Sequence, residues 1–300
     1  DTPYGEYIRS QIDNIGDEHW IKVYNGRCAF LNDENLCDMH CQIGPKHMAF
    51  TCRQYPDFTI TCDTYEVTGR TLSCPYVANR IVREKSKTKL IVEGKSNDEY
   101  ENEIFHIVNK CIEIAQDDSI KYRDREKAII DYIRKEQMYL VEKFKVDEIF
   151  MTEDNKTIWD YCDTLNSLNV VTEKWPKILS QLEELEYSEN DIVKFEEYLG
   201  DREKEYENIL VYFLYKHIMY GTNDGNVFQR VRFAIIATRI IFMVGLMKFI
   251  ENEEFTTEER YYYHEMYEAE VNISNYLKMR INHDDENIDT ILEDISLGMI

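Results

Sequence analysis

Apolar residues after about residue 96 recur mostly at intervals of three and four, which is the period of an amphipathic helix. One such stripe contains Ile104, Ile107, Val108, Cys111 and Ile114, and a second runs from Ile129 to Val141. The same period predicts further helices at about 155–168, 172–186, 189–199, 202–220, 225–252, 256–281 and 287–298. We therefore expect a mainly α protein with a helical-bundle domain.

Local signals mark where several of these helices begin and end. Ser188 is followed by Glu189 and Asp191, and Thr256 by Thr257, Glu258 and Glu259, which is typical of helix starts. Glycines at 200, 221 and 225 stand where helices should stop. The apolar run 233–250 carries Arg239 near its middle, so we interpret it as a core helix and not as a membrane span.

The first 95 residues follow a different pattern. Asp1-Thr2-Pro3 predicts a helix start, with Tyr4, Ile8 and Ile12 on one face. Short apolar runs follow, and those at 58–62 and 65–72 predict a small hairpin. A helix is expected at 75–83 and a connector at 83–95. This part is predicted to be a small, Cys-rich, partly β module.

Charge separates the same two parts. Residues 1–95 hold 13 acidic and 12 basic side chains, whereas residues 96–300 hold 45 and 23, so almost all of the net charge of −23 lies in the second part. We predict a metal-binding module at 1–95 and an α-helical domain at 96–300. The negative charge argues against binding to nucleic acid or to an anionic membrane, which requires basic side chains. An acidic surface suits a cationic partner, although it more often serves only solubility.

Six of the eight cysteines lie between residues 28 and 74, and thiolates are ligands for zinc and for iron–sulfur clusters. Their spacings do not include the Cys-x2-Cys unit of common zinc folds. Metal binding, buried free thiols and disulfides therefore all stay open. Cys111 and Cys162 fall on helical stripes and are expected in the core. The sequence has no glycine-rich phosphate loop, no nucleophile elbow and no His-Glu-x-x-His helix.

Several segments together resemble the flagellin lysine-N-methylases. They are Gly26–Leu31, Asn35-Leu36-Cys37, Thr51-Cys52-Arg53-Gln54-Tyr55-Pro56, Thr71–Ala78, and the helix Tyr206–Tyr215 followed by the apolar helix 230–250. Ala29 stands where the family usually has Pro, and Tyr76 where it usually has Glu. The family pattern also includes a Cys-rich stretch with a Cys-Cys pair, which we expect to lie ahead of Asp1 or to be absent.

The resemblance implies an enzyme that moves a methyl group from S-adenosylmethionine to lysine ε-amines of flagellin in the cytoplasm. It also implies a Cys-bound metal centre, either iron–sulfur or zinc. The cysteines that match the family pattern are Cys28, Cys37, Cys52 and Cys74, whereas Cys41 and Cys62 do not match.

Two residues are candidates for contact with the methyl donor. Arg53 follows Cys52, and its guanidinium could hold the donor's carboxylate with two hydrogen bonds. Its alternative role is a structural salt bridge. Tyr55 is the second candidate, and its alternative role is to shape the turn before Pro56. The sequence identifies no general base.

Two other functions are compatible with the same residues. The protein could be a non-enzymatic, metal-binding or chaperone-like partner of an exported cationic protein, which would form a stable complex without turnover. It could also be a helical scaffold whose cysteines are merely buried, in which case a chelator should change neither its melting nor its spectrum.

Overall fold

A computed structural model describes residues 2–16, 18–24, 27–147, 162, 165–166 and 172–273. The chain divides into two compact units, Asp1–Tyr55 and Pro56–Ile300. The boundary that the charge distribution predicts near residue 95 lies inside the second unit and stays a prediction. The helix expected at 287–298, the far part of that expected at 256–281 and most of that expected at 155–168 lie outside the described residues.

The first unit is small and partly β, as predicted. Its opening helix is N-capped by Thr2, whose hydroxyl accepts a hydrogen bond from the Gly5 amide at 3.1 Å. The expectation that Ile12 continues this helix is wrong, because Ile12 lies in a strand opposite Ile21. The elements are α1 (Pro3–Ser10), the hairpin of β1 (Ile12–Ile15) and β2 (Glu18–Ile21), the pair β3 (Val23–Tyr24) and β4 (Arg27–Cys28), α2 (Asp38–Ile43), a 3-10 turn (Pro45–His47) and α3 (Phe50–Gln54).

The second unit begins with the predicted hairpin, β5 (Asp57–Thr61) and β6 (Glu66–Arg70). Phe58 lies opposite Gly69, and a Cβ at Gly69 would come within 2.5 Å of the Phe58 ring. Glycine at this position therefore leaves room for the Phe58 ring against β6. The hairpin leads into α4 (Pro75–Arg83), whose bounds are those expected from the sequence. An irregular connector then runs to residue 98.

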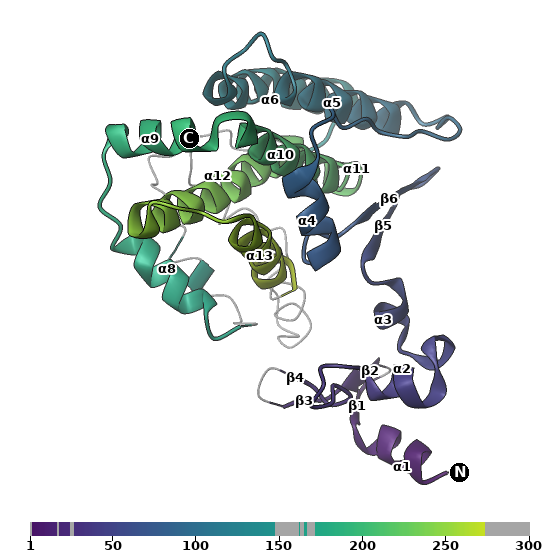
Figure 1. Cartoon of the computed structure of the whole chain (residues 1–300). Coiled ribbons are helices and arrows are strands. Elements are labelled where there is room, and N and C mark those ends of the chain that lie inside the picture. Colours follow the sequence, from purple (N-terminus) through teal and green to yellow (C-terminus); the bar gives the residue numbers. More distant parts are fainter. Residues whose placement is uncertain are drawn as a thin grey trace. The chain divides into compact units, whose positions relative to one another are not determined.

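The rest of the described unit is helical, which confirms the mainly α fold (Figure 1). The Ser188 and Thr256 hydroxyls each close a capping box at the helix starts that they mark in the sequence. Gly221 is different from the prediction, because it begins a short helix and does not end one. The helices are α5 (Glu99–Ala115), α6 (Tyr122–Phe144), α8 (Trp175–Glu183), α9 (Glu189–Leu199), α10 (Glu203–Ile218), α11 (Gly221–Asp224), α12 (Val227–Asn252) and α13 (Thr257–Glu268), with a 3-10 turn at Gly200–Arg202 and a π-helical turn at Ala269–Ile273.

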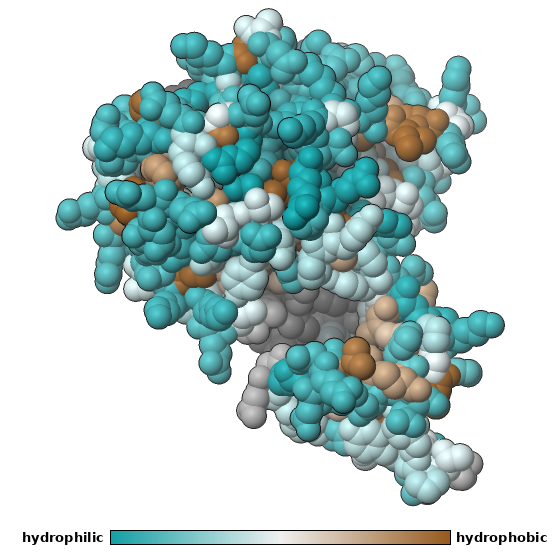
Figure 2. Space-filling view, in the orientation of Figure 1, coloured by the Kyte–Doolittle hydropathy of each residue, from teal (hydrophilic) through white to brown (hydrophobic). Residues whose placement is uncertain are grey.

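Helix α12 is the centre of this core. It packs against α6, α8, α9, α10 and α13. By length and hydropathy it could cross a membrane, but 78% of its apolar window is buried inside the protein. The surrounding helices therefore account for its apolar character, as the sequence predicts. The face of the second unit seen in Figure 2 is mostly hydrophilic, in keeping with its excess of acidic side chains.

Gly245 on α12 provides a test of how tightly this core is packed. A methyl group at this position would lie 2.7 Å from the Tyr206 hydroxyl, 2.9 Å from the Phe255 ring and 3.0 Å from the Phe195 ring. We expect Gly245→Ala to lower the free energy of unfolding by about 1–3 kcal/mol, because the crowding outweighs the gain in helix propensity. Urea unfolding measures the change.

The matched control for this variant is the double variant Gly245→Ala/Tyr206→Phe. The Tyr206 hydroxyl is buried and has no hydrogen-bond partner among the described residues, so its removal frees space at little cost. The double variant should regain part of the lost stability. An increase in stability for Gly245→Ala alone would show that the core has room at this position.

Candidate functional site

The first unit holds four of the candidate thiols. Cys28 lies in β4, Cys37 caps α2, Cys41 lies in α2 and Cys52 lies in α3, and all four are free. Burial raises the pKa of the Cys52 thiol, and the nearby thiols of Cys28 and Cys37 raise it further. Two of the predicted ligands, Cys28 and Cys37, therefore lie within electrostatic reach of a third, Cys52. The fourth, Cys74, is the N-cap residue of α4 in the second unit.

The described geometry does not assemble these thiols into a ready metal site. No group of three or more His, Cys, Asp or Glu side chains that could hold a metal ion occurs among the described residues. The raised pKa of Cys52 also favours the protonated thiol, whereas a metal needs the thiolate. The donor chemistry suits zinc or iron–sulfur, but the metal centre stays a prediction, and no chemical step is derived through it.

The two residues predicted to contact the cofactor lie beside Cys52. The Arg53 guanidinium lies 6.0 Å from the centre of the Phe50 ring, within the same short helix. Arg53 and Tyr55 are both exposed, and neither lines the groove described next. Their role in cofactor binding stays a prediction.

A groove of about 690 Å³ opens on the second unit between β6, the end of α4, the connector and α10. Its floor is one face of α10, formed by Asn208, Val211, Tyr212 and Tyr215 at helical spacing. Phe58 of β5 stands against Tyr215, with their ring centres 6.5 Å apart. The groove thus combines a wall of three aromatic rings with polar groups, and its volume is in the range of about 300–1,000 Å³ that is usual for small-molecule sites.

The Tyr212 side chain of the groove floor belongs to a buried ionic cluster with Glu268, Lys216 and Thr71. The Tyr212 hydroxyl donates to Glu268 Oε1 at 2.7 Å and accepts from the Leu72 amide at 3.0 Å. Lys216 forms an ion pair with the same carboxylate oxygen, and the Thr71 hydroxyl donates to it at 3.3 Å. Glu268 is completely buried. The cluster therefore ties the loop before α4 to α10 and α13.

The cluster also fixes the protonation state of the groove floor. Burial raises the pKa of Tyr212 well above its ordinary value, and the Glu268 carboxylate raises it further. The phenol consequently stays protonated near neutral pH and acts as a donor. The Lys216 ammonium lies 5.5 Å from the centre of the Phe58 ring and 5.7 Å from that of Tyr212, so its charge is shared between Glu268 and two aromatic faces.

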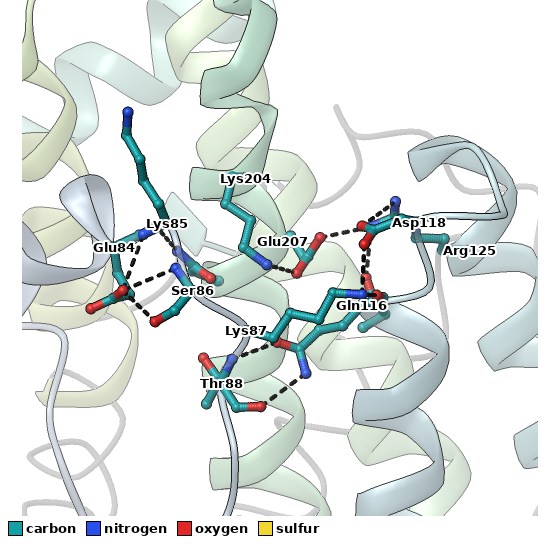
Figure 3. A network of polar contacts seen from close by, with 12 residues as sticks. Glu84, Lys85, Ser86, Lys87, Thr88, Gln116, Asp118, Arg125, Lys204 and Glu207 are labelled. Carbon is teal, nitrogen blue, oxygen red and sulfur yellow. Dashed lines mark hydrogen bonds and ion pairs between the residues drawn. The ribbon is translucent and has the colours of Figure 1, made fainter.

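The connector forms one wall of the groove, and a network of polar contacts holds it in place (Figure 3). Thr88 exchanges two hydrogen bonds with the Gln116 side chain, at 2.7 and 3.0 Å. Lys87 donates to the Gln116 carbonyl at 2.7 Å and pairs with Asp118 at 2.6 Å. Arg125 lies 3.7 Å from Asp118 and donates to Glu207 of α10 at 2.7 Å. This wall is therefore anchored to α5, α6 and α10, despite having no regular structure.

Glu84 stands at the end of α4, between the groove and a second cavity of about 420 Å³. The Ser86 hydroxyl and amide donate to its carboxylate and lower its pKa to about 2, so it stays ionised. Five basic residues and four acidic residues line the second cavity, namely Arg83, Lys85, Arg202, Lys204 and Arg260, and Glu84, Asp201, Glu205 and Glu258. Its lining is therefore nearly neutral and contains no aromatic ring. The groove differs from it by its aromatic wall, and aromatic faces attract a sulfonium or the ammonium group of a lysine.

The sequence shows the segments that build this site but not the chemistry of their side chains. The segments 206–215 and 71–78 resemble a known family, but the resemblance gives no role to Asn208 or Tyr212. The one sequence feature that points to these two residues is the polar and aromatic face of an otherwise apolar helix. No sequence feature points to Glu268, because its partner Thr71 lies 197 residues away in the chain.

The fold and the groove define a helical protein with a groove of small-molecule size on its larger unit. Residues 152–297 match the family model of the FliB lysine N-methylase C-terminal domain. This part of the chain is therefore similar to that domain, in agreement with the family resemblance seen in the sequence. The match includes α10 and α13, and thus Asn208, Tyr212, Lys216 and Glu268. A search of curated proteins and a search of solved structures each gave no match.

Proposed function

We propose that the protein is a lysine N-methyltransferase that moves methyl groups from S-adenosylmethionine to the ε-amines of flagellin lysines. The observation that carries this proposal is the family match, since the matched residues build the floor of the groove and the ionic cluster below it. The nature of the acceptor comes from the resemblance to flagellin lysine-N-methylases.

Methyl transfer requires the neutral form of the lysine amine, because only that form has a free electron pair. Bound S-adenosylmethionine supplies a methyl group on a positively charged sulfur; the amine nitrogen bonds to this carbon while the sulfur keeps the electrons of the broken bond. The ring of Phe58 at the edge of the groove would exclude water from an arriving ammonium group. Desolvation lowers the pKa of an amine and so favours loss of its proton to solvent before attack.

Carboxylates at the groove would attract the substrate in its cationic form. Glu66, Glu84 and Glu93 all line the groove, and Glu84 is held ionised by the hydrogen bonds described above. They are balanced by Arg70, Arg80 and Lys89, so the groove can take both a cationic side chain and the carboxylate of an amino acid.

We also propose that the protein acts in the cytoplasm. The support is the state of seven cysteines that form no disulfide with one another, namely Cys28, Cys37, Cys41, Cys52, Cys62, Cys74 and Cys111. Free thiols are the usual state of cysteine in a reducing compartment, whereas secreted proteins usually form disulfides.

The test is to incubate the purified full chain with flagellin and S-adenosylmethionine and to measure the intact mass of flagellin. We expect the mass to rise in steps of one methyl unit, and peptide mapping to place the steps on lysines. Flagellin whose lysines have been acetylated is the matched control and should not change, because the amide nitrogen is not nucleophilic. A stable complex with unmodified flagellin would instead support the non-enzymatic partner, and the proposal would be wrong.

A further inference from the structure

Asn208 on the groove floor carries an unused hydrogen-bond acceptor. Its side-chain amide donates both hydrogens, to the Ile81 carbonyl at 3.2 Å and to the Glu84 carbonyl at 2.9 Å. These two bonds fix the orientation of the amide, because a flipped oxygen would face two carbonyls. The residue is 5% exposed, and its Oδ1 atom is buried without a partner among the described residues. Since buried acceptors are nearly always paired, this oxygen calls for a donor from a ligand.

Aromatic rings stand on the same helix face as this acceptor. Tyr212 and Tyr215 follow Asn208 by four and seven residues, and both line the groove. The Tyr215 hydroxyl donates to the Thr68 carbonyl of β6 at 2.8 Å, which fixes the ring against the hairpin. A flat heteroaromatic base with an amino group would stack on such rings while its amine donates to Asn208.

The charged residues of the groove match the other parts of a nucleoside joined to an amino acid. The ionised carboxylate of Glu84 can accept hydrogen bonds from the hydroxyls of a ribose. The guanidinium of Arg80 lies 3.5 Å from Glu84, is mostly exposed and is able to bind a carboxylate. A lysine side chain alone would leave most of the 690 Å³ unfilled.

We infer that this groove, and not the Arg53–Tyr55 segment, binds the adenosyl part of the methyl donor, with the adenine amine donating to Asn208 Oδ1 and the base against the rings of Tyr212 and Tyr215. The inference rests on the proposed function, because methyl transfer is the reason to expect an adenosyl ligand. It assigns the site of the methyl donor, which the sequence did not locate in this unit.

The first test changes the ligand and leaves the protein intact. Isothermal titration of the full chain with S-adenosylhomocysteine is compared with titration by S-inosylhomocysteine, in which a carbonyl oxygen replaces the adenine amine. We expect the adenosyl compound to bind at least about tenfold more tightly, because the inosyl carbonyl would face the unpaired Asn208 oxygen. Equal affinities, or no binding of either compound, would overturn the inference.

The second test changes the ring and keeps the fold under control. Tyr215→Ala removes the stacking surface and should weaken S-adenosylhomocysteine binding by about tenfold or more. Tyr215→Phe keeps the ring and loses only the hydrogen bond to Thr68, so its affinity should stay within about twofold of the original. Thermal melting followed by circular dichroism confirms that both variants are folded. Unchanged binding by Tyr215→Ala would contradict the inference.

The outcomes separate this inference from the proposed function. If flagellin is methylated while the groove variants bind S-adenosylhomocysteine normally, the function stands and the donor lies elsewhere. If the protein binds S-adenosylhomocysteine more tightly than S-inosylhomocysteine but does not modify flagellin, the groove is the site of the methyl donor and the proposal that flagellin is the substrate is wrong. Variants Arg53→Ala and Tyr55→Ala, made in parallel, should leave the affinity unchanged if the groove is the site.

Discussion

Replacing Lys216 with methionine should lower the free energy of unfolding by about 3–5 kcal/mol, as expected when one partner of a buried ion pair is removed. The Glu268 carboxylate is completely buried, and Lys216 is its cationic partner. Methionine has a similar length and fills the same space, so the loss comes mainly from the uncompensated charge. Urea unfolding at neutral pH, with the slope checked for two-state behaviour, measures the effect.

Two control variants show whether the charge is the cause. In Lys216→Met/Glu268→Gln the amide oxygen can still accept from Tyr212, and most of the stability should return. Lys194→Met removes an exposed ammonium that lies 3.9 Å from Asp191 and should change stability by no more than about 0.5 kcal/mol. A loss for Lys216→Met no larger than that for Lys194→Met would show that the buried pair contributes little.

Stability should also depend on pH through Glu205. This residue is 3% exposed, and burial raises its pKa to about 7, although Arg260 and Arg202 oppose the shift. Its Oε2 atom lies 2.9 Å from Arg260 Nε. Between pH 4.5, the ordinary pKa of a glutamate side chain, and about pH 7, the folded protein holds a proton that the unfolded chain has lost. The contribution of Glu205 to stability therefore falls as pH rises through this window, by up to roughly 3 kcal/mol.

The variant Glu205→Gln isolates this effect, because glutamine cannot ionise. We expect the unfolding free energy of the original protein, relative to that of Glu205→Gln, to decrease between about pH 5 and pH 7.5. Urea unfolding at several pH values gives this difference. Glu258→Gln, at an exposed position that lines the same cavity, is the matched control. A difference that is constant across the window would mean that Glu205 has the same proton occupancy in both states.

Capping residues and first-turn prolines in the sequence correctly predicted helix starts, because residues within one turn decide where a helix begins. Pro75 begins α4 and Ser188 caps α9, as expected, because caps and first-turn prolines act within one helical turn. The predicted secondary structure was wrong where contacts with residues outside the segment override its local helical preference. Ile12 fits the helical period of α1, but pairing with Ile21 draws it into a strand. Gly221 resembles a helix end, yet it begins α11, where it packs under Val227.

The sequence by itself determined the helical architecture, the central place of α12, the partly β character of the Cys-rich module and the similarity of the carboxy-terminal half to a known family. These properties follow from periodicity, capping and motif similarity, which are local or additive along the chain. The sequence also proposed a cysteine ligand set, which the described residues do not group into a metal site.

Only the tertiary structure decided which polar groups meet. Tyr212 reaches the Leu72 amide across 140 residues, and Glu268 lies between Lys216, Tyr212 and Thr71. The free acceptor of Asn208 exists because two carbonyls near the end of α4 occupy its amide hydrogens. Hydrogen bonds and ion pairs depend on distances of a few ångströms, and chain folding sets such distances independently of separation in the sequence.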